Sequence, residues 1–252
     1  MKLQYCSDLH LEISENETYL TRRPLEPVSE VLILAGDILP FNLHKTQPDF
    51  INYIADHYEM VYWVPGNHEY YGMDAATVAN PLLEQLRSNV WMVNNQVVKY
   101  KGVHLICTTM WSKIDVLHAL DIQRSVTDFR NIDWKGERFS TRQFNQLHNQ
   151  SMTFLEKAIK EKAAGTNIVV THHVPTLMNY PQKYKGSPVN GAFATELHDL
   201  IYDSGVNYWI YGHHHTNTPE FKIGNTTMLT NQLGYVRRHE HGSFSRGKVV
   251  EV

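Results

Sequence analysis

The sequence predicts a layered α/β domain. Short apolar runs alternate with helical patterns along the chain, which is the order expected of strands and helices packed in layers. Several apolar runs end in polar clusters, and open α/β sheets bind their ligands at such strand ends. A length of 252 residues, 42% of them hydrophobic, is enough for a sizeable core. Because no internal repeat, low-complexity tract or linker is visible, one domain over residues 1–252 is the simplest organisation.

The strands of the first half are expected at short apolar runs. They cover 3–6, 31–35, 61–64, 90–93, 97–100 and 103–107, the last two joined by a tight turn at Lys101-Gly102. The continuous apolar run 31–35 is typical of a strand buried on both faces. Helices are expected at 49–58 and 74–88, and Pro81 predicts a kink or break in the second because it cannot donate a backbone hydrogen bond.

A long helix dominates the second half. Thr141 is its expected N-cap, and Gly165 ends it near Ala164. Its apolar positions form a helical stripe of Phe144, Leu147, Phe154, Leu155, Ala158 and Ile159. Another helix is expected at 193–202, and strands at 168–170, 208–211 and, hairpin-like, at 221–223, 226–230 and 248–252. Residues 111–140 lack clean periodicity, and 178–190 are expected to form a loop.

Composition narrows the function classes. The formal net charge of -3 provides no general attraction to nucleic acid or anionic membrane, so any phosphate binding must be local. Two cysteines, Cys6 and Cys107, cannot form a disulfide framework and suit a reducing cytoplasm, where we expect the protein. No signal peptide is expected at the strand-like start, and no stretch approaches the ~20 apolar residues of a membrane span.

Polar clusters follow the expected strands. They are Asp8-x-His10, Gly36-Asp37, Gly66-Asn67-His68-Glu69, His172-His173 and Gly212-His213-x-His215. Side chains two apart at a strand end, such as Asp8 and His10, can converge on one ion, and the carboxylate of Asp37 can bridge two ions. Carboxylate, amide and imidazole donors together suit divalent Mn, Fe, Co, Ni or Zn.

Such a donor set predicts hydrolysis of a phosphate ester by two metal ions. Ions about 3.5–4 Å apart would clamp a phosphoryl group and activate a bridging water, whose hydroxide attacks phosphorus. His68 adjoins Asn67 and cannot easily face the same ion. It is therefore free to protonate the leaving oxygen or to stabilise its charge. Each cluster alone is more often a turn or a solvated loop, and only their conjunction favours a metal centre.

These clusters resemble the signature of the calcineurin-like metallophosphoesterases, from residue 8 to residue 215. The resemblance implies a four-layer αββα sandwich of two mixed β-sheets flanked by helices. It implies one ion held by Asp8, His10 and His215, another by Asn67, His172 and His213, with Asp37 bridging and His68 catalytic. It gives His173 a supporting role and turns His214 away from the ions. Residues 108–111 and 231–235 resemble a branch of small bacterial phosphoesterases.

One departure from the family pattern is informative. The Ser/Thr phosphoprotein phosphatases extend the second motif to Gly-Asp-x-x-Asp-Arg-Gly, whereas Pro40 and Phe41 stand here in place of the second Asp and the Arg. The carboxylate partner of the catalytic histidine and a phosphate-clamping arginine are therefore missing from that place. This argues against a protein phosphatase of that branch.

Two segments, 110–140 and 174–191, are expected to cover the site. Their cations stand beside aromatic residues, which suits a phosphate attached to a flat group such as a nucleobase. We expect Arg130, Tyr184 and Tyr70 to contact substrate, although packing and solvation explain such residues equally well. Tyr71 shares this ambiguity.

The leading hypothesis is a metal-dependent phosphodiesterase or phosphomonoesterase acting on a small phosphorylated molecule, with a nucleotide among the candidates. A metal-dependent nuclease is an alternative that the acidic balance disfavours. A non-catalytic metal-binding scaffold is another alternative. We expect neither a membrane nor a nucleic acid as partner, and the oligomeric state is open.

Overall fold

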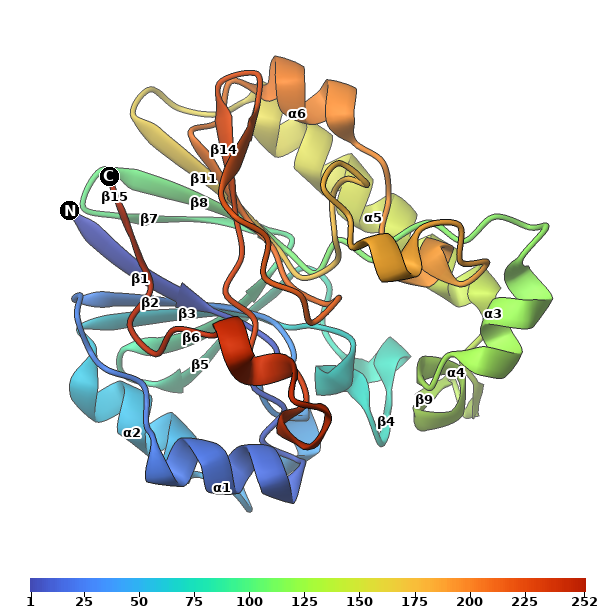
Figure 1. Ribbon diagram of the computed structural model, residues 1–252, viewed down its shortest axis with the longest axis horizontal. Coiled ribbons are helices and arrows are strands. Elements are labelled where there is room, and N and C mark those ends of the chain that lie inside the picture. The colour runs from blue at the N-terminus through green and yellow to red at the C-terminus, as the bar shows by residue number, and fades with distance from the viewer.

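The computed structural model describes residues 1–252. Two mixed six-stranded sheets lie face to face, with helices outside both (Figure 1). The first sheet has the order β15-β1-β2-β3-β6-β5. Its strands are β15 (Val249–Glu251), β1 (Lys2–Cys6), β2 (Val31–Ala35), β3 (Met60–Val64), β6 (Val90–Asn94) and β5 (Leu82–Arg87). The four inner strands are parallel, and both edge strands pair antiparallel.

The second sheet repeats this plan with the order β13-β14-β12-β11-β8-β7. Its four inner strands are again parallel and its edges antiparallel. The strands are β13 (Phe221–Ile223), β14 (Thr226–Leu229), β12 (Tyr208–Ile210), β11 (Thr166–Thr171), β8 (Val103–Thr108) and β7 (Gln96–Tyr100). A core between the sheets joins side chains of both, for example Ile33 and Val64 with Leu105 and Val170.

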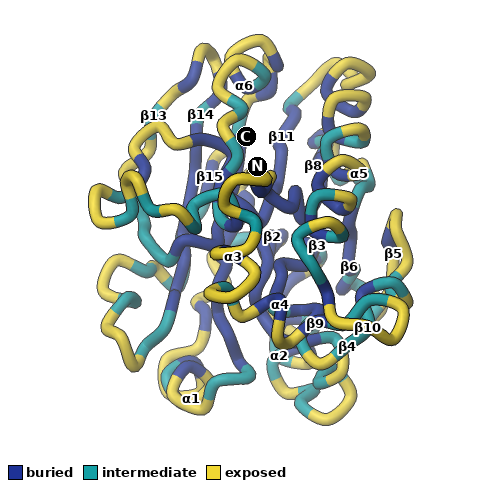
Figure 2. The backbone as a smooth tube through the Cα atoms, turned by 90° about the vertical axis from the view of Figure 1, so that its right-hand side faces the viewer, coloured by how far each residue is buried: buried dark blue, intermediate teal, exposed yellow.

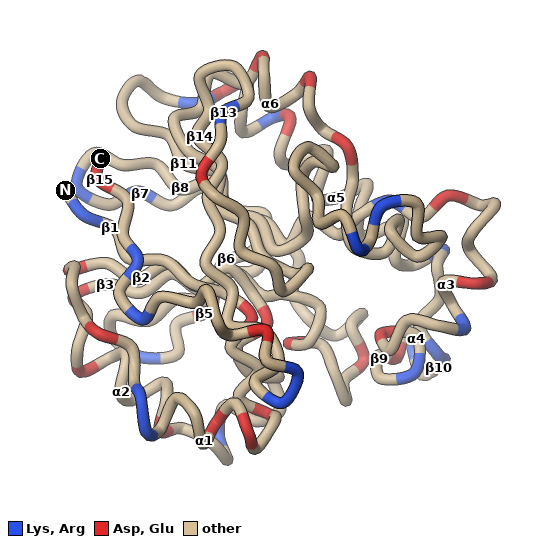
Figure 3. The backbone as a smooth tube through the Cα atoms, in the orientation of Figure 1, with Lys and Arg blue, Asp and Glu red and all other residues tan.

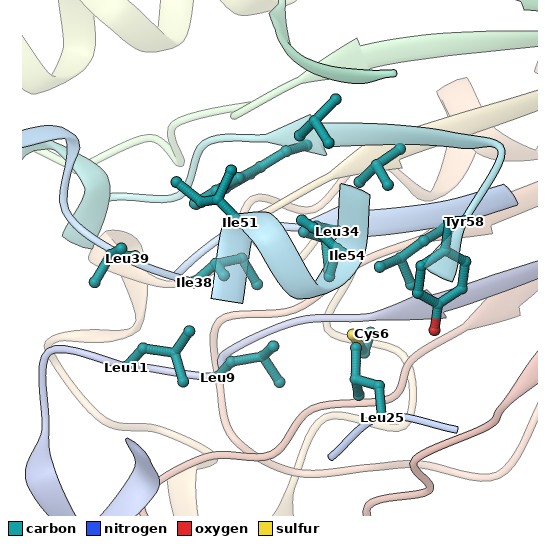
Figure 4. Close-up of a cluster of buried hydrophobic side chains, with 14 of the residues drawn as sticks. Cys6, Leu9, Leu11, Leu25, Leu34, Ile38, Leu39, Ile51, Ile54 and Tyr58 are labelled. Carbon is teal, nitrogen blue, oxygen red and sulfur yellow. The ribbon is translucent and has the colours of Figure 1, made fainter. Parts of the chain in front are cut away.

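Helices cover the outer face of each sheet. Those of the first sheet are α1 (Ser14–Arg22) and α2 (Asp49–His57), and those of the second are α5 (Thr141–Lys160) and α6 (His198–Ser204). Figure 4 shows how α2 turns Ile51 and Ile54 onto the sheet residue Leu34. The inner strands of both sheets are mostly buried, whereas the edge strand β5 and the outer sides of the helices are exposed (Figure 2). The expected four-layer sandwich is therefore confirmed.

A smaller substructure projects from one edge of the sandwich (Figure 1). It contains α3 (Ala119–Ser125), α4 (Asp128–Asn131) and a three-stranded sheet of β10 (Glu137–Arg138), β9 (Ile132–Trp134) and β4 (Met73–Asp74). Its own core packs Trp111, Phe129 and Phe139 against Phe144 of α5. Short 3-10 turns complete the chain: η1 (Phe41–Leu43), η2 (His68–Tyr70), η3 (Ala75–Thr77), η4 (Gln182–Tyr184), η5 (Asn190–Ala192), η6 (Val236–Arg238) and η7 (Glu240–Ser243).

The prediction of a helix at 74–88 was wrong. The chain instead forms β4, η3 and then β5, with a cis peptide bond between Asn80 and Pro81. Residues from Leu82 onward pair antiparallel with β6, starting at Asn94. The open edge of β6 offers these residues a hydrogen-bonding partner that the local pattern could not reveal, and Pro81 already prevents a continuous helix.

Smaller differences also have physical reasons. The long helix takes Ser140 as N-cap, in a capping box with Gln143, and ends at Lys160. The helix expected at 193–202 starts only at His198, because Phe193–Thr195 hydrogen-bond with Val174 as an extended bridge. The final strand pairs with β1 rather than forming a hairpin. Helix α1 was missed because it buries only Asn16 and Leu20 and so shows little apolar pattern.

Candidate metal centre

The polar clusters meet at one edge of the sandwich. Asp8, Asp37 and Asn67 follow the ends of β1, β2 and β3, while His172 and His213 follow β11 and β12. All of these are inner parallel strands, so their carboxyl ends lie at a common edge. The side chains belong to both sheets, so the centre forms only when the sheets are packed together.

The backbone turns sharply at most of these positions. Positive φ angles occur at Asp8 (58°), His10 (47°), Asp37 (57°), His213 (80°) and His215 (50°). The convergence of residues two apart therefore depends on left-handed turns after the strand, not on the extended strand end that the spacing suggested. Non-glycine residues rarely adopt this conformation, and it persists where surrounding contacts impose it.

Hydrogen bonds between motifs impose these turns. The backbone N–H of His213 donates to Asp8 Oδ1 at 3.0 Å, and that of His68 donates to Asp37 Oδ1 at 2.8 Å. Glu69 is fully buried and accepts hydrogen bonds from the backbone N–H groups of Asp37 and Gly66 at 2.9 and 2.7 Å. The second and third motifs are thus tied together by one carboxylate.

A close approach explains one motif glycine. Gly36 has φ +89°, and a Cβ at this position would collide with the ring of His172. Only glycine allows the second motif to pass so close to the His172 ring.

One group of donor atoms comprises Asp8, His10 and His215. The Nε2 atoms of His10 and His215 lie 2.9 Å apart, and His215 Nε2 lies 3.4 Å from Asp8 Oδ1. The other group comprises Asn67, His172 and His213. His172 Nε2 lies 3.1 Å from Asn67 Oδ1 and 3.0 Å from His213 Nδ1.

Asp37 stands between the two groups. Its Oδ2 atom lies 3.7 Å from His10 Nε2 and 3.3 Å from His172 Nε2. Asp8, His10 and Asp37 are almost fully buried, with exposed fractions of 0%, 0% and 1%. A single carboxylate oxygen therefore faces both groups.

These residues fit divalent ions. Donors bound to a common ion at about 2.1 Å are separated by roughly 3.0–3.4 Å, which is close to the spacings within each group. The carboxylates also favour positive charge here. Burial opposes protonation of His172, but Asp37 outweighs it and raises the pKa of His172 to about 10. Burial likewise opposes protonation of His215, yet Asp8 and Glu240 raise its pKa to about 9.

Each candidate imidazole ligand is also held through its other nitrogen. His10 Nδ1 lies 3.1 Å from Glu12 Oε1, and His215 Nδ1 lies 2.8 Å from Glu240 Oε2. His172 Nδ1 lies 2.9 Å from the carbonyl oxygen of Ala35. Such contacts orient metal-ligating histidines and set their tautomer. Glu12 and Glu240 lie outside the motifs recognised in the sequence, although Glu12 follows His10 at the same spacing that separates His10 from Asp8.

His68 stands beside the donor groups. Its Nδ1 atom lies 2.8 Å from Glu12 Oε1, and its ring stacks on Tyr71 with centroids 4.0 Å apart. Burial opposes protonation of His68, but Asp37 and Glu12 outweigh it and raise its pKa above the usual value. Glu12, two residues after the first motif, thus gives His68 the carboxylate partner that is missing after Asp37. Phe41, where an arginine was absent, packs on Tyr70 instead.

Asp128 of α4 connects the projecting substructure to the centre. Its Oδ1 atom accepts hydrogen bonds from Asn67 Nδ2 at 2.8 Å and from the Tyr71 hydroxyl at 2.7 Å. The contact turns the amide oxygen of Asn67 toward His172. Asp128 is 1% exposed, and its Oδ2 atom has no partner within the chain. No spacing signal marks this residue, because it lies in the irregular segment.

A cavity of about 330 Å³ opens over the centre. Both segments expected to cover the site contribute to its wall, through Thr127 and Asp128 and through Tyr180 and Tyr184. Its remaining aromatic residues are Tyr71, Phe193 and Tyr235. Arg238 is the only Lys or Arg among the lining residues.

Three residues were expected to contact substrate, and only Tyr184 lines this cavity. Tyr70 is 4% exposed and packs between Phe41 and Trp111 in the core, because its side chain points away from the His68 side of the turn. Arg130 is exposed, and its guanidinium donates to the carbonyl oxygen of Arg124. The structure thus places Tyr70 and Arg130 away from the cavity.

The neighbours of the candidate ligands have separate partners. The His173 ring is fully buried and lies 4.2 Å from the His213 ring, centroid to centroid. His214 contacts Gln232, whose side-chain Oε1 also accepts the backbone N–H of His215 at 2.7 Å. Gln232, part of the 231–235 segment noted in the sequence, therefore holds the last motif in place.

Comparisons with known proteins agree with this architecture. The calcineurin-like phosphoesterase family model matches residues 1–217. Uncharacterized protein L509 of Acanthamoeba polyphaga mimivirus is 27% identical over 277 residues, covering 99% of this chain and 96% of that protein. The crystal structure of phosphopantetheinyl hydrolase (PptH) from Mycobacterium tuberculosis is similar with a TM-score of 0.72 and 17% identity, covering 99% of this chain and 95% of that one. No helix of the chain combines the length and apolar character needed to cross a membrane.

Proposed function

Because the chain belongs to the calcineurin-like phosphoesterase family and is a metal-dependent phosphoesterase, we propose that it hydrolyses a small phosphate ester at two divalent ions. Asp8, His10 and His215 would hold one ion, Asn67, His172 and His213 would hold the other, and Asp37 would contact both. The observation that carries this proposal is the position of Asp37 Oδ2, 3.7 Å from His10 Nε2 and 3.3 Å from His172 Nε2.

Two bound ions supply Lewis acidity at the phosphoryl oxygens and a nucleophilic water at neutral pH. The donor set of carboxylate, amide and imidazole suits Mn, Fe, Zn, Co or Ni. The chain's own residues fix where these donors stand. Asp128 orients the Asn67 amide, Glu12 orients the His10 ring, and Glu240 orients the His215 ring.

His68 is the proposed proton donor to the leaving oxygen. Glu12 accepts the Nδ1–H of His68, which leaves Nε2 as the nitrogen free to face the substrate. Tyr71 stacks on the same ring, with the two centroids 4.0 Å apart. A proton delivered by a positioned histidine contributes about 10²–10⁴ to the rate of such reactions.

The proposed substrate is a small molecule. The cavity of about 330 Å³ and its aromatic wall accommodate a compact organic group next to the phosphoryl group. Lys and Arg positions are interspersed with Asp and Glu along the backbone (Figure 3), and the formal net charge is -3. This balance disfavours a long nucleic acid as substrate. The name of the mycobacterial neighbour makes a phosphopantetheinyl ester one candidate, beside nucleotides.

We further propose that residues 1–252 act as one unit in the cytoplasm. The inner core combines both sheets, and β15 closes the chain onto β1. Cys6 and Cys107 are buried and unpaired, which suits a reducing compartment.

The test is a panel of phosphomonoesters, phosphodiesters and cyclic phosphates with metal-stripped protein reloaded with Mn, Fe, Zn, Co or Ni. We expect hydrolysis of p-nitrophenyl phosphate or its bis-ester to disappear on stripping and to return with at least one metal. Failure of every metal to restore activity would refute the proposal. An inactive protein that still loads two ions would indicate a scaffold, and salt-sensitive DNA cleavage a nuclease.

A further inference from the structure

The turn at residues 234–240 contacts two candidate ligand residues, Asp8 and His215, through hydrogen bonds. The backbone N–H of Gly234 donates to the carbonyl oxygen of Asp8 at 3.1 Å. Glu240 Oε2 accepts the backbone N–H of Tyr235 at 2.8 Å and lies 2.8 Å from His215 Nδ1. The positions of Tyr235 and Arg238 are therefore fixed relative to the candidate ligands.

Tyr235 lies directly against two of those ligands. Its ring centroid is 4.8 Å from that of His10 and 4.5 Å from that of His215. Tyr235 hydrogen-bonds within the chain through its backbone alone. Its side chain lines the cavity. The ring therefore forms part of the wall next to the place of the ions.

Arg238 lies over this ring. Its guanidinium carbon is 5.2 Å from the Tyr235 centroid, within the range of a cation–π contact. The guanidinium forms no ion pair with any carboxylate of the centre and donates no side-chain hydrogen bond within the chain. Burial falls from His10, which is fully buried, through half-buried Tyr235 to exposed Arg238. Arg238 thus stands at the mouth of the cavity.

Arg238 is the one Lys or Arg in the cavity wall. The ionisable lining residues besides histidines and tyrosines are Asp37, Asp128, Glu240 and Arg238. An anionic substituent of the substrate therefore finds no guanidinium or ammonium group in the wall other than that of Arg238. Guanidinium groups bind carboxylates and phosphates through paired hydrogen bonds, which gives direction as well as charge.

We propose that Arg238, supported by Tyr235, binds a second anionic group of the substrate, at the end remote from the phosphoryl group at the ions. This rests on the proposed phosphoesterase function and narrows its substrate class to esters that carry a further negative charge. Arg237 provides the comparison. It lies 5.7 Å from the same ring centroid, is exposed like Arg238, and does not line the cavity.

The experiment uses the full chain loaded with the most activating metal and three aryl phosphates: phenyl phosphate and its 3-carboxy and 4-carboxy derivatives. These differ by one negative charge on the ring. We expect the unmodified protein to prefer at least one carboxylated ester. Arg238→Ala should raise KM for that ester by about five- to thirtyfold, with a smaller change for phenyl phosphate. Arg238→Lys should recover part of the loss.

The matched control is Arg237→Ala, which should leave the preference intact. The preference should also weaken at high salt in the unmodified protein and become insensitive to salt in Arg238→Ala, because screening acts on the charge pair. Equal effects of Arg238→Ala on all three esters, equal effects of the two alanine variants, or no preference in the unmodified protein would each overturn the assignment. Absence of phenyl phosphate hydrolysis with every metal would instead reject the proposed function itself, and the assignment with it.

Discussion

Glu12 Oε1 lies 2.8 Å from Nδ1 of His68, across 56 residues of chain. The same oxygen lies 3.1 Å from Nδ1 of His10. One carboxylate therefore orients both a proposed metal ligand and the proposed proton donor. Glu12, two residues after the first motif, is therefore the acidic partner of the proposed proton donor, and the second motif supplies none at the position of Pro40.

Replacing Glu12 by Gln should move the alkaline limit of activity to lower pH. Asp37 and Glu12 hold the pKa of His68 above its usual value against the effect of burial, and removing one negative charge lowers that pKa. Since His68 donates a proton only when protonated, activity should then be lost earlier as pH rises. A pH–rate profile measures this, with Glu17→Gln of α1 as control. An unchanged alkaline limit would show that Glu12 does not raise the pKa of the proton donor.

Replacing His68 by Ala should lower kcat by about 10²–10⁴ while both ions remain bound. The reason is that neither of the two proposed ion sites includes His68, although His10, Glu12 and His68 also lie close enough together to hold an ion. Turnover and metal content per chain are measured on the same sample, with the exposed His57→Ala as control. Loss of both ions would show that His68 is a ligand.

Replacing Asp128 by Ala should lower the affinity for the ion at Asn67, His172 and His213 by about 10- to 100-fold. The variant removes the acceptor that turns the Asn67 amide oxygen inward. Asp128→Asn should be milder, because its amide oxygen still accepts from Asn67 and Tyr71. Metal titration by calorimetry distinguishes them, with Asp121→Ala of α3 as control. If Asp128→Ala bound both ions normally, the orienting role would be wrong.

Replacing Gly36 by Ala should destabilise the protein by more than the same change at Gly136. Both glycines have positive φ, so both variants incur backbone strain, but only a Cβ at Gly36 meets a neighbour, the His172 ring. We expect a difference in unfolding free energy of about 1–3 kcal/mol. Chemical denaturation of the two variants measures it. Equal losses would mean that the His172 contact relaxes without cost.

Removal of the ions should lower the melting temperature. The donor residues follow strands of both sheets, so the site for the ions exists only in the folded chain. A ligand that binds only the folded state stabilises it in proportion to the logarithm of its concentration over Kd. Calorimetry with and without chelator should show a fall of several degrees, reversed by added Mn. If the chelator left the melting temperature unchanged, this would argue against ion binding.

The sequence by itself predicted the layered fold and the polar clusters, because both depend on residues that are close together in the chain. A buried strand is a short apolar run, and the residues after it belong to the same few positions of chain. Strands such as 31–35 and the donor residues Asp37 and His172 were therefore visible without any tertiary information.

Only the tertiary structure decided which residues surround those donors. Glu12 reaches His68, Asp128 reaches Asn67 61 residues away, and Arg238 reaches the cavity from the far end of the chain. The same holds for residues 82–87, which become a strand only because β6 offers a free edge. Such contacts join segments with no common period or spacing, so the chain has to fold before they exist.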